Sequence, residues 1–374
     1  MKNSFKIFVI NPGSTSTKIA LFQNDERLFS ANVEHNTEEL LACATIPEQL
    51  PFRLKTIQGE LAKRGVDLTG IDAISTRSGG LVSLTGGVYR INDLLYEHSK
   101  NCLTVRHPNT LGPQLARALA EEYGIENIFT VNPPDVDELD EEERVCGFHE
   151  LSRESRGHPL NHKENGIRYA AKVGRRYEDM NLIICHMGGG VTVAAHRKGR
   201  MCCVNDCING DGPMAPTRAG WLPATKIVDM CFSGRYTAAE MYNRITKSGG
   251  FTDHLGTADA REIVRRISEG DAYAKLIYDA FAYSVCKEIG ACAAVLGGSV
   301  DAIILTGGMA HEISLVDAIT ARVSWIAPVV VQAGEFEMEG LASGAIRVLR
   351  GEEEAREYTG VPVWSGFRGA PVAE

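Results

Sequence analysis

Two stretches of the chain share a pattern of apolar runs separated by turns of small residues. Residues 6–22 read KIFVINPGSTSTKIALF, in which two β-rich apolar runs flank a turn of Pro, Gly, Ser and Thr. Residues 182–200 read LIICHMGGGVTVAAHRKGR and repeat the order of strand, turn and strand. Apolar runs bounded by Gly and Pro predict strands joined by tight turns. The repetition, about 175 residues apart, predicts a duplicated β-rich α/β domain.

Further strands and helices follow from the same kind of pattern. A third buried strand is predicted in VDAIILTGGMA, residues 300–310, which contains Gly307-Gly308. Apolar residues at helical spacing predict helices over residues 109–123, 163–177, 258–269, 272–296 and 338–358. The acidic run VDELDEEER, residues 136–144, is typical of a solvated surface turn or the start of a helix.

Length and charge narrow the class of protein. The length of 374 residues predicts two or three domains. The chain has 39 basic and 48 acidic residues and a net charge of −9, so no basic surplus is available for nucleic acid. The N-terminal apolar run is too short for a signal peptide, and residues 277–296 carry charges that argue against a membrane span. We therefore expect a cytoplasmic protein without membrane or nucleic-acid partners.

The ten cysteines are too sparse for a disulfide scaffold. Cys202, Cys203 and Cys207 form the one cluster, but no CxxC pair occurs. Zinc would need a fourth ligand and a better spacing, so buried thiols in a reducing cytosol are the favoured interpretation.

Three glycine- or serine-rich turns follow predicted strands. In NPGSTSTK, residues 11–18, small residues allow backbone N–H groups to approach a phosphate, the hydroxyls of Ser14 and Ser16 can donate to it, and Lys18 adds a positive charge. Alone, this segment is equally consistent with an ordinary hairpin. Gly188-Gly189-Gly190 and Gly307-Gly308 occupy equivalent strand ends, and the three turns together favour a nucleotide ligand.

Two arginines and two histidines complete the candidate chemistry. Arg77 and Arg218 lie in loops of small residues, where a guanidinium can address a phosphoryl oxygen or a carboxylate. One loop arginine alone is more often a surface charge, whereas one in each half of the chain indicates a cleft. His107 and His158 precede prolines. The HxxxH from His158 is a weak zinc signal because Pro159 follows directly and no Glu is present.

These motifs together resemble the acetate and butyrate kinase family, and its butyrate kinase branch in particular. The resemblance runs from Ile7 to about Tyr358 and includes INPGSTSTKIALF, HMGGGVTVAAHRKGR, LGTADAREI and GEFEMEGLASGA. It implies an α/β fold with two RNase-H-like domains, as in actin, Hsp70 and sugar kinases, around an ATP cleft. The implied domains are residues 1–132 completed by a C-terminal helix at about 340–360, and residues 133–339. The tail, residues 361–374, receives no role.

The resemblance also implies an activity. Such a phosphotransferase passes a phosphoryl group reversibly from ATP to the carboxyl group of butyrate or a similar acid, branched acids included, with magnesium. Acetate or propionate is the alternative substrate, and a homodimer or higher homo-oligomer is expected. The family's catalytic residues then fall on a first-domain asparagine, on two substrate-side arginines and on two histidines near the transferred group: Asn11; Arg77, Arg218; His107, His158. Its nucleotide-binding residues fall on Ser14, Ser16, Gly188, Gly189, Gly190, Gly307 and Gly308, and its magnesium-side glutamate falls on Glu339.

One position departs from the family pattern. Asn132 stands after a predicted strand where the family usually carries an aspartate that helps to organise magnesium, with Asp135 and Asp137 nearby. A kinase acting on a hydroxyl needs an aspartate base, so Asn132 fits a carboxylate substrate better. Three alternatives stay open: a sugar- or glycerol-type kinase, an ATP-switched assembly or chaperone-like protein, and a less active homologue of the family.

Overall fold

The chain divides into two compact units. The computed structural model describes residues 2 and 4–368, so the predicted tail at 361–374 lies partly outside the described residues. Unit 1 is formed by the chain up to Asp137 together with Phe336–Arg368, and unit 2 is formed by Glu138–Glu335.

Unit 1 is built on a six-stranded mixed sheet. Its strands are β1 (Lys6–Pro12), β2 (Ser16–Gln23), β3 (Glu26–Glu34), β4 (Ala73–Thr76), β5 (Val88–Arg90) and β6 (Ile128–Val131). They lie in the order β3-β2-β1-β4-β6-β5. The first three strands form an antiparallel meander, and β4 and β6 continue the sheet parallel to β1.

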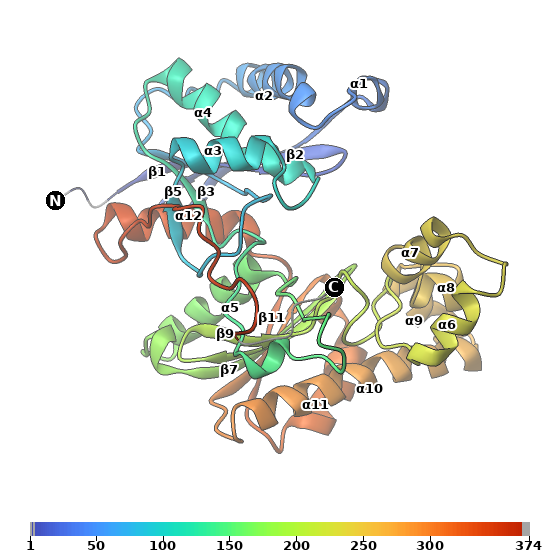
Figure 1. Cartoon of the computed structure of the whole chain (residues 1–374). Helices are drawn as coiled ribbons and strands as arrows, with labels where there is room; N and C mark the ends of the chain where they lie inside the picture. Colours follow the sequence, from blue (N-terminus) through green and yellow to red (C-terminus); the bar gives the residue numbers. More distant parts are fainter. Residues whose placement is uncertain (1, 3, 369–374) are drawn as a thin grey trace. The chain divides into compact units, whose positions relative to one another are not determined.

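Helices cover both faces of this sheet (Figure 1). The helices of unit 1 are α1 (Thr37–Ala42), which buries no residue, α2 (Leu50–Arg64), α3 (Asp93–Lys100), α4 (Gly112–Tyr123) and α12 (Glu337–Leu349). Phe8 and Ile10 of β1 pack with Ile57 of α2 and Leu115 of α4. Helix α12 contacts β1, β4 and β6. Gly344 allows this contact, because a Cβ there would lie 2.7 Å from Val131.

Unit 2 repeats the sheet of unit 1. Its strands are β7 (Asn181–Met187), β8 (Val191–Arg197), β9 (Arg200–Val204), β10 (Ala302–Gly307) and β11 (Val329–Ala333). Their order is β11-β10-β7-β8-β9, again an antiparallel meander followed by two strands parallel to its first member. The strand-turn-strand repeat in the sequence therefore predicted a true structural duplication.

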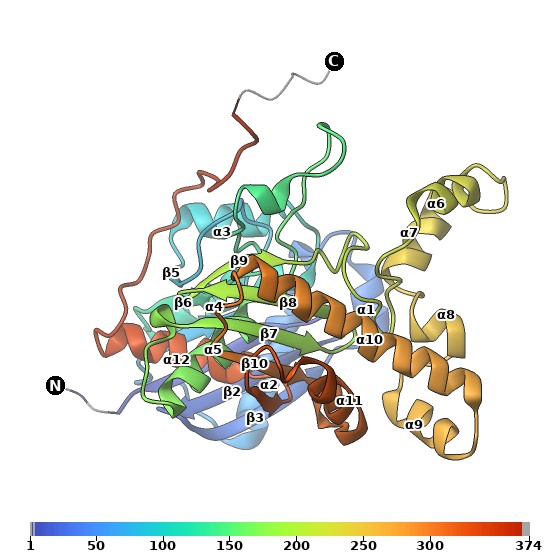
Figure 2. The same ribbon diagram turned by 90° about the horizontal axis from the view of Figure 1, so that it is seen from below.

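The central strands of unit 2 are buried on both faces. Ile183, Cys185 and Met187 of β7 join one core, whereas Leu182 and Ile184 join another. The helices are α5 (Pro159–Lys172), α6 (Ala224–Cys231), α7 (Ala238–Thr246), α8 (Phe251–Leu255), α9 (Ala260–Ser268), α10 (Ala272–Val295) and α11 (Ile313–Val323). Helices α10 and α5 cover opposite faces, and α6 to α9 gather at one end of α10 (Figure 2). None of the helices in residues 2 and 4–368 is long and apolar enough to cross a membrane.

Three predictions about elements need correction. The helix predicted over 163–177 begins at Pro159, because proline is well suited to the first helical position, and it ends at Lys172 before Gly174 at φ 68°. The helix predicted over 338–358 ends at Leu349, since Gly351 adopts φ 73°. The acidic run at 136–144 is not a solvated turn throughout, because Val136, Asp137, Leu139 and Arg144 are buried.

Candidate functional site

The turn between β1 and β2 holds the first candidate phosphate site. Asn11 faces Lys18 in the hairpin register, and the Gly13 N–H donates to the Ser16 carbonyl at 2.7 Å. Ser14 and Lys18 are exposed, and Ser16 is half-buried. The turn can therefore offer hydroxyl and ammonium donors to an anion in unit 1.

A buried arginine that sequence reasoning missed supports this turn. Arg53 of α2 is fully buried, and its guanidinium donates to the carbonyls of Gly13 and Ser14 at 3.0 and 3.2 Å and to Thr17 Oγ1 at 3.1 Å. No carboxylate among the described residues forms an ion pair with it, and burial lowers its pKa to about 10. Its positive charge is thus held directly beneath the turn, which favours an anion above it.

Arg77 lies with Asn11 and a glutamate at the start of α12. The Arg77 guanidinium pairs with Glu337, and Asn11 Nδ2 donates to Glu337 Oε2 at 2.8 Å. Gly112 permits the Arg77 loop to pass, since a Cβ there would lie 1.8 Å from the Arg77 carbonyl oxygen. Glu339, the predicted magnesium residue, instead pairs with the exposed Arg27 at 3.4 Å.

His107 is exposed in part, and its surroundings favour the neutral form of its ring. Its Nδ1 accepts from the Asn109 N–H at 3.2 Å at the start of a 3-10 turn, Pro108–Leu111. Desolvation and then the positive charges of Arg77 and Arg53 lower the pKa of His107, although the bond to Asn109 acts in the opposite direction. In the neutral form, the ring can donate a hydrogen bond without adding charge.

In unit 2, Arg218 lies directly against the triple-glycine turn between β7 and β8. A Cβ at Gly190 would lie 1.8 Å from Arg218 Nη1, so glycine is required for this approach. Thr217 Oγ1 donates to the Gly189 carbonyl at 3.0 Å, and Gly188 N–H donates to the Gly190 carbonyl at 3.0 Å. The structure thus joins the predicted glycine turn and the predicted arginine.

The second glycine turn of unit 2 follows β10. Gly307 has φ 89° and exchanges two backbone hydrogen bonds with Gly334. A Cβ at Gly307 would lie 2.3 Å from the Met187 carbonyl oxygen, whereas one at Gly308 would meet nothing within 4 Å. Tight packing therefore explains Gly307, and Gly308 is left with open space beside it.

His158 lies at the N-terminus of α5 and contacts groups from β7 and β8. Its Nδ1 is 2.9 Å from Thr192 Oγ1, and its ring stacks on His186 with centroids 4.1 Å apart. Asn161 Nδ2 donates to His186 Nδ1 at 2.7 Å. Sequence reasoning missed His186, although a histidine just before Gly188, in an apolar strand, was an available signal.

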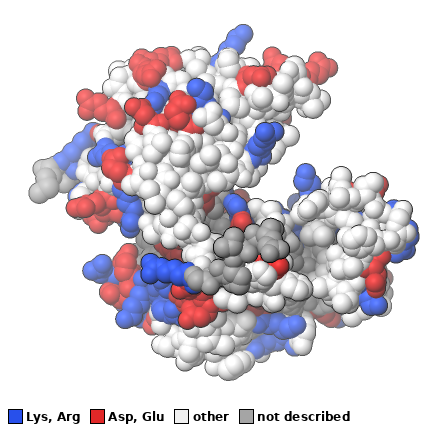
Figure 3. All heavy atoms as spheres, viewed as in Figure 1, with Lys and Arg blue, Asp and Glu red and all other residues white. Residues whose placement is uncertain are grey.

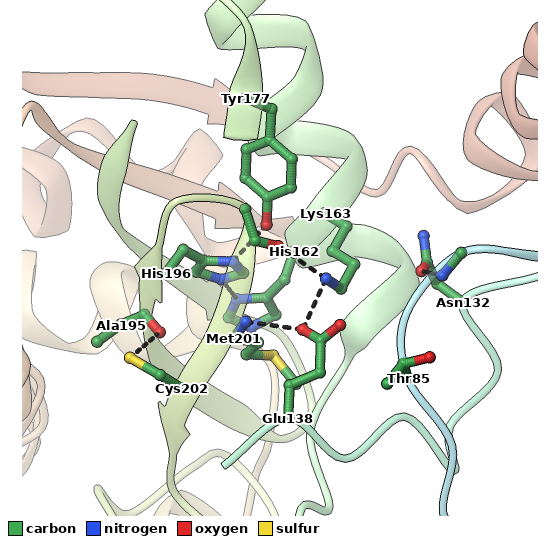
Figure 4. Close-up of polar contacts among 12 residues, drawn as sticks. Thr85, Asn132, Glu138, His162, Lys163, Tyr177, Ala195, His196, Met201 and Cys202 are labelled. Atoms are coloured by element: carbon green, nitrogen blue, oxygen red, sulfur yellow. Dashed lines mark hydrogen bonds and ion pairs between the residues drawn. The ribbon is translucent and has the colours of Figure 1, made fainter. Parts of the chain in front are cut away.

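A second pair of histidines, His162 and His196, lies in the interior of unit 2 (Figure 4). His162 and His196 are fully buried, and Lys163 beside them pairs with Glu138 at 2.7 Å. Burial lowers the pKa of His162 to about 3 and that of His196 well below 6.5, with Lys163 adding to both shifts. Both rings are therefore neutral at pH 7.

These buried histidines predict acid lability. Between about pH 6.5 and pH 3 the unfolded chain takes up a proton at His162 that the folded chain refuses, so stability falls as pH falls, by up to about 1.4 kcal/mol per pH unit. Glu288, whose pKa burial raises to about 7, acts in the opposite sense. Urea unfolding of wild type and His162→Gln at pH 7, 6 and 5 isolates the histidine. We expect a shallower loss in the variant, and equal slopes would contradict the assignment.

Asn132 has a structural role that its sequence position did not reveal. It adopts φ 40° after β6, a region that asparagine tolerates well. Its Oδ1 accepts from the Gly87 N–H at 2.8 Å, and its own N–H donates to the Gly87 carbonyl at 3.0 Å. The side-chain oxygen, the one atom that could serve a cation, is thus engaged by the backbone.

The cysteine cluster agrees with the expectation of buried thiols. Cys202, Cys203 and Cys207 are all buried. Arg218 Nη1 lies 3.2 Å from Cys207 Sγ, and burial raises the pKa of that thiol to about 11. Within the described part of the chain, no group of three or more His, Cys, Asp or Glu side chains is arranged to hold a metal ion.

Comparisons with known proteins identify the relatives of this chain. The sequence model of the acetokinase family matches residues 154–324. A probable butyrate kinase of Clostridium botulinum is 43% identical over 355 residues, covering 95% of this chain and 100% of the relative. Butyrate kinase 2 of Clostridium acetobutylicum is 43% identical over 354 residues, covering 95% and 99%.

Solved structures agree on the fold. An acetate kinase of Porphyromonas gingivalis superposes with a TM-score of 0.74 at 19% identity, covering 92% of this chain and 100% of the other. A propionate kinase of Francisella tularensis gives 0.71 at 18% identity, covering 91% and 98%. The predicted class of two duplicated actin-like α/β domains is confirmed. With relatives at this identity along almost its whole length, the chain belongs to the acetokinase family.

Proposed function

We propose that this protein is a carboxylate kinase that transfers the γ-phosphoryl group of ATP to butyrate or a similar short-chain acid, branched acids included. The products are an acyl phosphate and ADP, and the reaction is reversible. The observation that carries the proposal is the pair of arginines at small-residue turns, Arg77 in unit 1 and Arg218 in unit 2. The names of the butyrate kinase relatives support the choice of acceptor.

The residues fit a reaction that needs charge neutralisation rather than a base. A short-chain acid has a pKa near that of glutamic acid, about 4.3, so its carboxylate is already a nucleophile at pH 7. The obstacle is repulsion between this anion and the phosphate oxygens. Arg77 and Arg218 offset that charge through bidentate hydrogen bonds. His107 and His158 donate hydrogen bonds to the transferred group, and Asn11 acts with them. Ser14, Ser16 and Lys18 bind the nucleotide phosphates together with the glycine turns.

Asn132 separates this function from the nearest alternative. A kinase of sugars or glycerol must remove a proton from a hydroxyl, which calls for a carboxylate base. Asn132 is neutral, and its oxygen is held by Gly87. Acetate or propionate in place of butyrate is the second candidate, since a pocket distinguishes one methylene by only about 1–3 kcal/mol.

Magnesium fits the donor set of unit 1, where it would neutralise phosphate charge when bound. Magnesium uses one or two carboxylates with waters and phosphate oxygens, so a three-carboxylate cluster is not required. Glu339 was predicted from the sequence, but Glu337 is the better candidate because it lies with Asn11 and Arg77. Glu339 lies with Arg27 instead.

Other properties stay predictions. These are a cytoplasmic location, a homodimer or higher homo-oligomer, and domains of residues 1–132 with the last helix and of residues 133–339. The absence of a nucleic-acid partner is supported by the net charge of −9 and by the mixing of acidic and basic side chains on the face in Figure 3.

A hydroxylamine trap tests the proposed function and its acyl-chain range. Purified protein is incubated with ATP, magnesium and each of the linear and branched acids from C2 to C6, and the hydroxamate formed is measured. We expect hydroxamate that depends on ATP, with the highest kcat/KM for a C4 acid. Phosphorylation of a polyol without any hydroxamate would instead support the sugar-kinase alternative.

A further inference from the structure

A continuous line of polar contacts runs through unit 2 from Tyr177 to His158, and Figure 4 labels its first three members, Tyr177, His196 and His162. Tyr177 Oη lies 2.6 Å from His196 Nδ1, and His196 Nε2 lies 3.4 Å from His162 Nδ1, the longest contact of the line. His162 Nε2 lies 2.8 Å from Thr192 Oγ1, which in turn lies 2.9 Å from His158 Nδ1. The rings of His196 and His162 therefore each contact one neighbour through each nitrogen.

The two central rings can carry only one proton each. His162 and His196 are fully buried and adjacent to the Lys163 ammonium, which excludes the imidazolium form at neutral pH. A neutral imidazole has one N–H donor and one acceptor nitrogen. The tautomer of one ring therefore dictates that of the next, since two facing N–H groups or two facing lone pairs would lose the bond.

Tyr177 decides in which direction the hydrogen bonds of the line are donated. Its side chain is 6% exposed, and burial keeps its pKa well above 10, so the hydroxyl retains its proton. Among the described residues, Tyr177 Oη has one hydrogen-bond partner, His196 Nδ1. The proton must point there, because any other direction leaves a buried donor unpaired. The position of Tyr177 is itself built in, since a Cβ at Gly166 of α5 would lie 2.5 Å from its ring.

The remaining protons follow in order. With His196 accepting at Nδ1, its Nε2–H donates to His162 Nδ1, and His162 Nε2–H donates to Thr192 Oγ1. Thr192 then donates its hydroxyl proton to His158 Nδ1. His158 must accept at Nδ1 and carry its own proton on Nε2.

We propose that the line Tyr177–His196–His162–Thr192 is a positioning device that fixes His158 as the Nε2–H tautomer. A candidate site histidine is thereby obliged to present a hydrogen-bond donor rather than a lone pair. This consequence rests on the proposed function, in which a donor stabilises oxygens of the transferred phosphoryl group and an acceptor would repel them. The tautomer itself does not depend on that function.

Nitrogen chemical shifts of the histidine rings test the tautomer without substrate. In full-length protein labelled with ¹⁵N-histidine at pH 8, with His158 assigned by its loss in His158→Gln, we expect a protonated Nε2 and an unprotonated Nδ1. Tyr177→Phe removes the hydroxyl that donates to His196 Nδ1. That nitrogen then has no partner, whether it carries a proton or a lone pair, so neither direction of donation along the line is favoured. We expect His158 to become a mixture of tautomers, while Tyr169→Phe, in helix α5 and outside the line of contacts, changes nothing. A His158 protonated on Nδ1 in wild type, or unmoved by Tyr177→Phe, would overturn the proposal.

Thr192 variants test the consequence for catalysis. Thr192→Val keeps the shape but removes the donor to His158, and we expect kcat to fall by roughly tenfold or more with KM for the acid little changed, the scale of losses at outer-shell residues. Thr192→Ser retains a hydroxyl and should restore both the rate and the His158 shifts. If Thr192→Val moves the His158 shifts without changing kcat, the link to catalysis is wrong. If wild type shows no kinase activity, the proposed function fails while the tautomer result still stands.

Discussion

Replacing either Arg77 or Arg218 with alanine should lower kcat by roughly 10³-fold or more, the scale of arginine losses in phosphoryl transfer. Each guanidinium lies at a turn of small residues. Arg77 forms an ion pair with Glu337, and Arg218 packs against Gly190, which has no side chain to block it. Arg→Lys at either position keeps the charge but loses the planar fork, so we expect only partial recovery. Steady-state kinetics with varied acid and varied ATP measures the effect.

Two controls separate catalysis from folding. Arg27→Ala removes an exposed arginine of unit 1 whose ion pair with Glu339 contributes little, and it should leave kcat unchanged. Gly190→Ala would push a methyl group into Arg218 and should reproduce much of the Arg218→Ala loss with the guanidinium still present. Turnover near the wild-type value in Arg77→Ala or Arg218→Ala would remove that arginine from the active site.

Glu337→Gln should raise the magnesium concentration needed for half-maximal activity by about tenfold or more, because one carboxylate of a site that uses only one or two is lost. The substitution is nearly isosteric and keeps an acceptor for Asn11 Nδ2, so unfolding in urea should change much less than activity. Magnesium titrations at saturating ATP measure the shift.

Glu339→Gln is the matched control, two residues away on the same helix. Its carboxylate pairs with the exposed Arg27, so the titration should stay close to that of wild type. The reverse pattern, a silent Glu337→Gln and a shifted Glu339→Gln, would restore the sequence-based choice of Glu339.

The fold was largely predictable because its information is local and repeated. Residues 6–22 and residues 182–200 each read as strand, turn and strand. Each segment forms the first hairpin of its sheet, β1 with β2 and β7 with β8. Helix ends were predicted less well. Helix α12 ends at Leu349 because Gly351 adopts a left-handed conformation. The sequence-based prediction extended the helix to residue 358 because it gave more weight to the spacing of residues than to this glycine.

The parts of the candidate site that the sequence predicted are glycines and arginines that belong to motifs. Gly190 and Arg218, which lie against each other in the structure, belong to two motifs that are both visible in the sequence. Arg53 and Glu337 could not be found in this way, because their importance comes from tertiary packing. Arg53 reaches Gly13 across 40 residues, and Glu337 reaches Asn11 across 326. The neighbourhood of Arg53 carries no motif, and the motif GEFEMEGLASGA contains both Glu337 and Glu339 without indicating which carboxylate lies beside Asn11.

The acidic run at 136–144 shows the limit of reading charge alone. Glu138 accepts from the Met201 N–H at 2.8 Å and pairs with Lys163, so its carboxylate is part of the interior of unit 2. Leu139 joins Ala194 and Met201 in a small core. Buried charges of this kind are retained when their partners are supplied from other elements, which composition cannot reveal.

Isotope transfer tests the central claim most directly, namely that a carboxylate oxygen of the substrate attacks the γ-phosphorus of ATP. Butyrate labelled with ¹⁸O in both carboxyl oxygens is incubated with the protein, ATP and magnesium, and hydroxylamine then attacks the acyl carbon of the product and releases inorganic phosphate. The account predicts one ¹⁸O atom in each phosphate released, because the bridging oxygen comes from the acid and leaves with phosphorus. Phosphate without ¹⁸O, formed at the rate of ATP consumption, would mean that water is the nucleophile and would contradict the account.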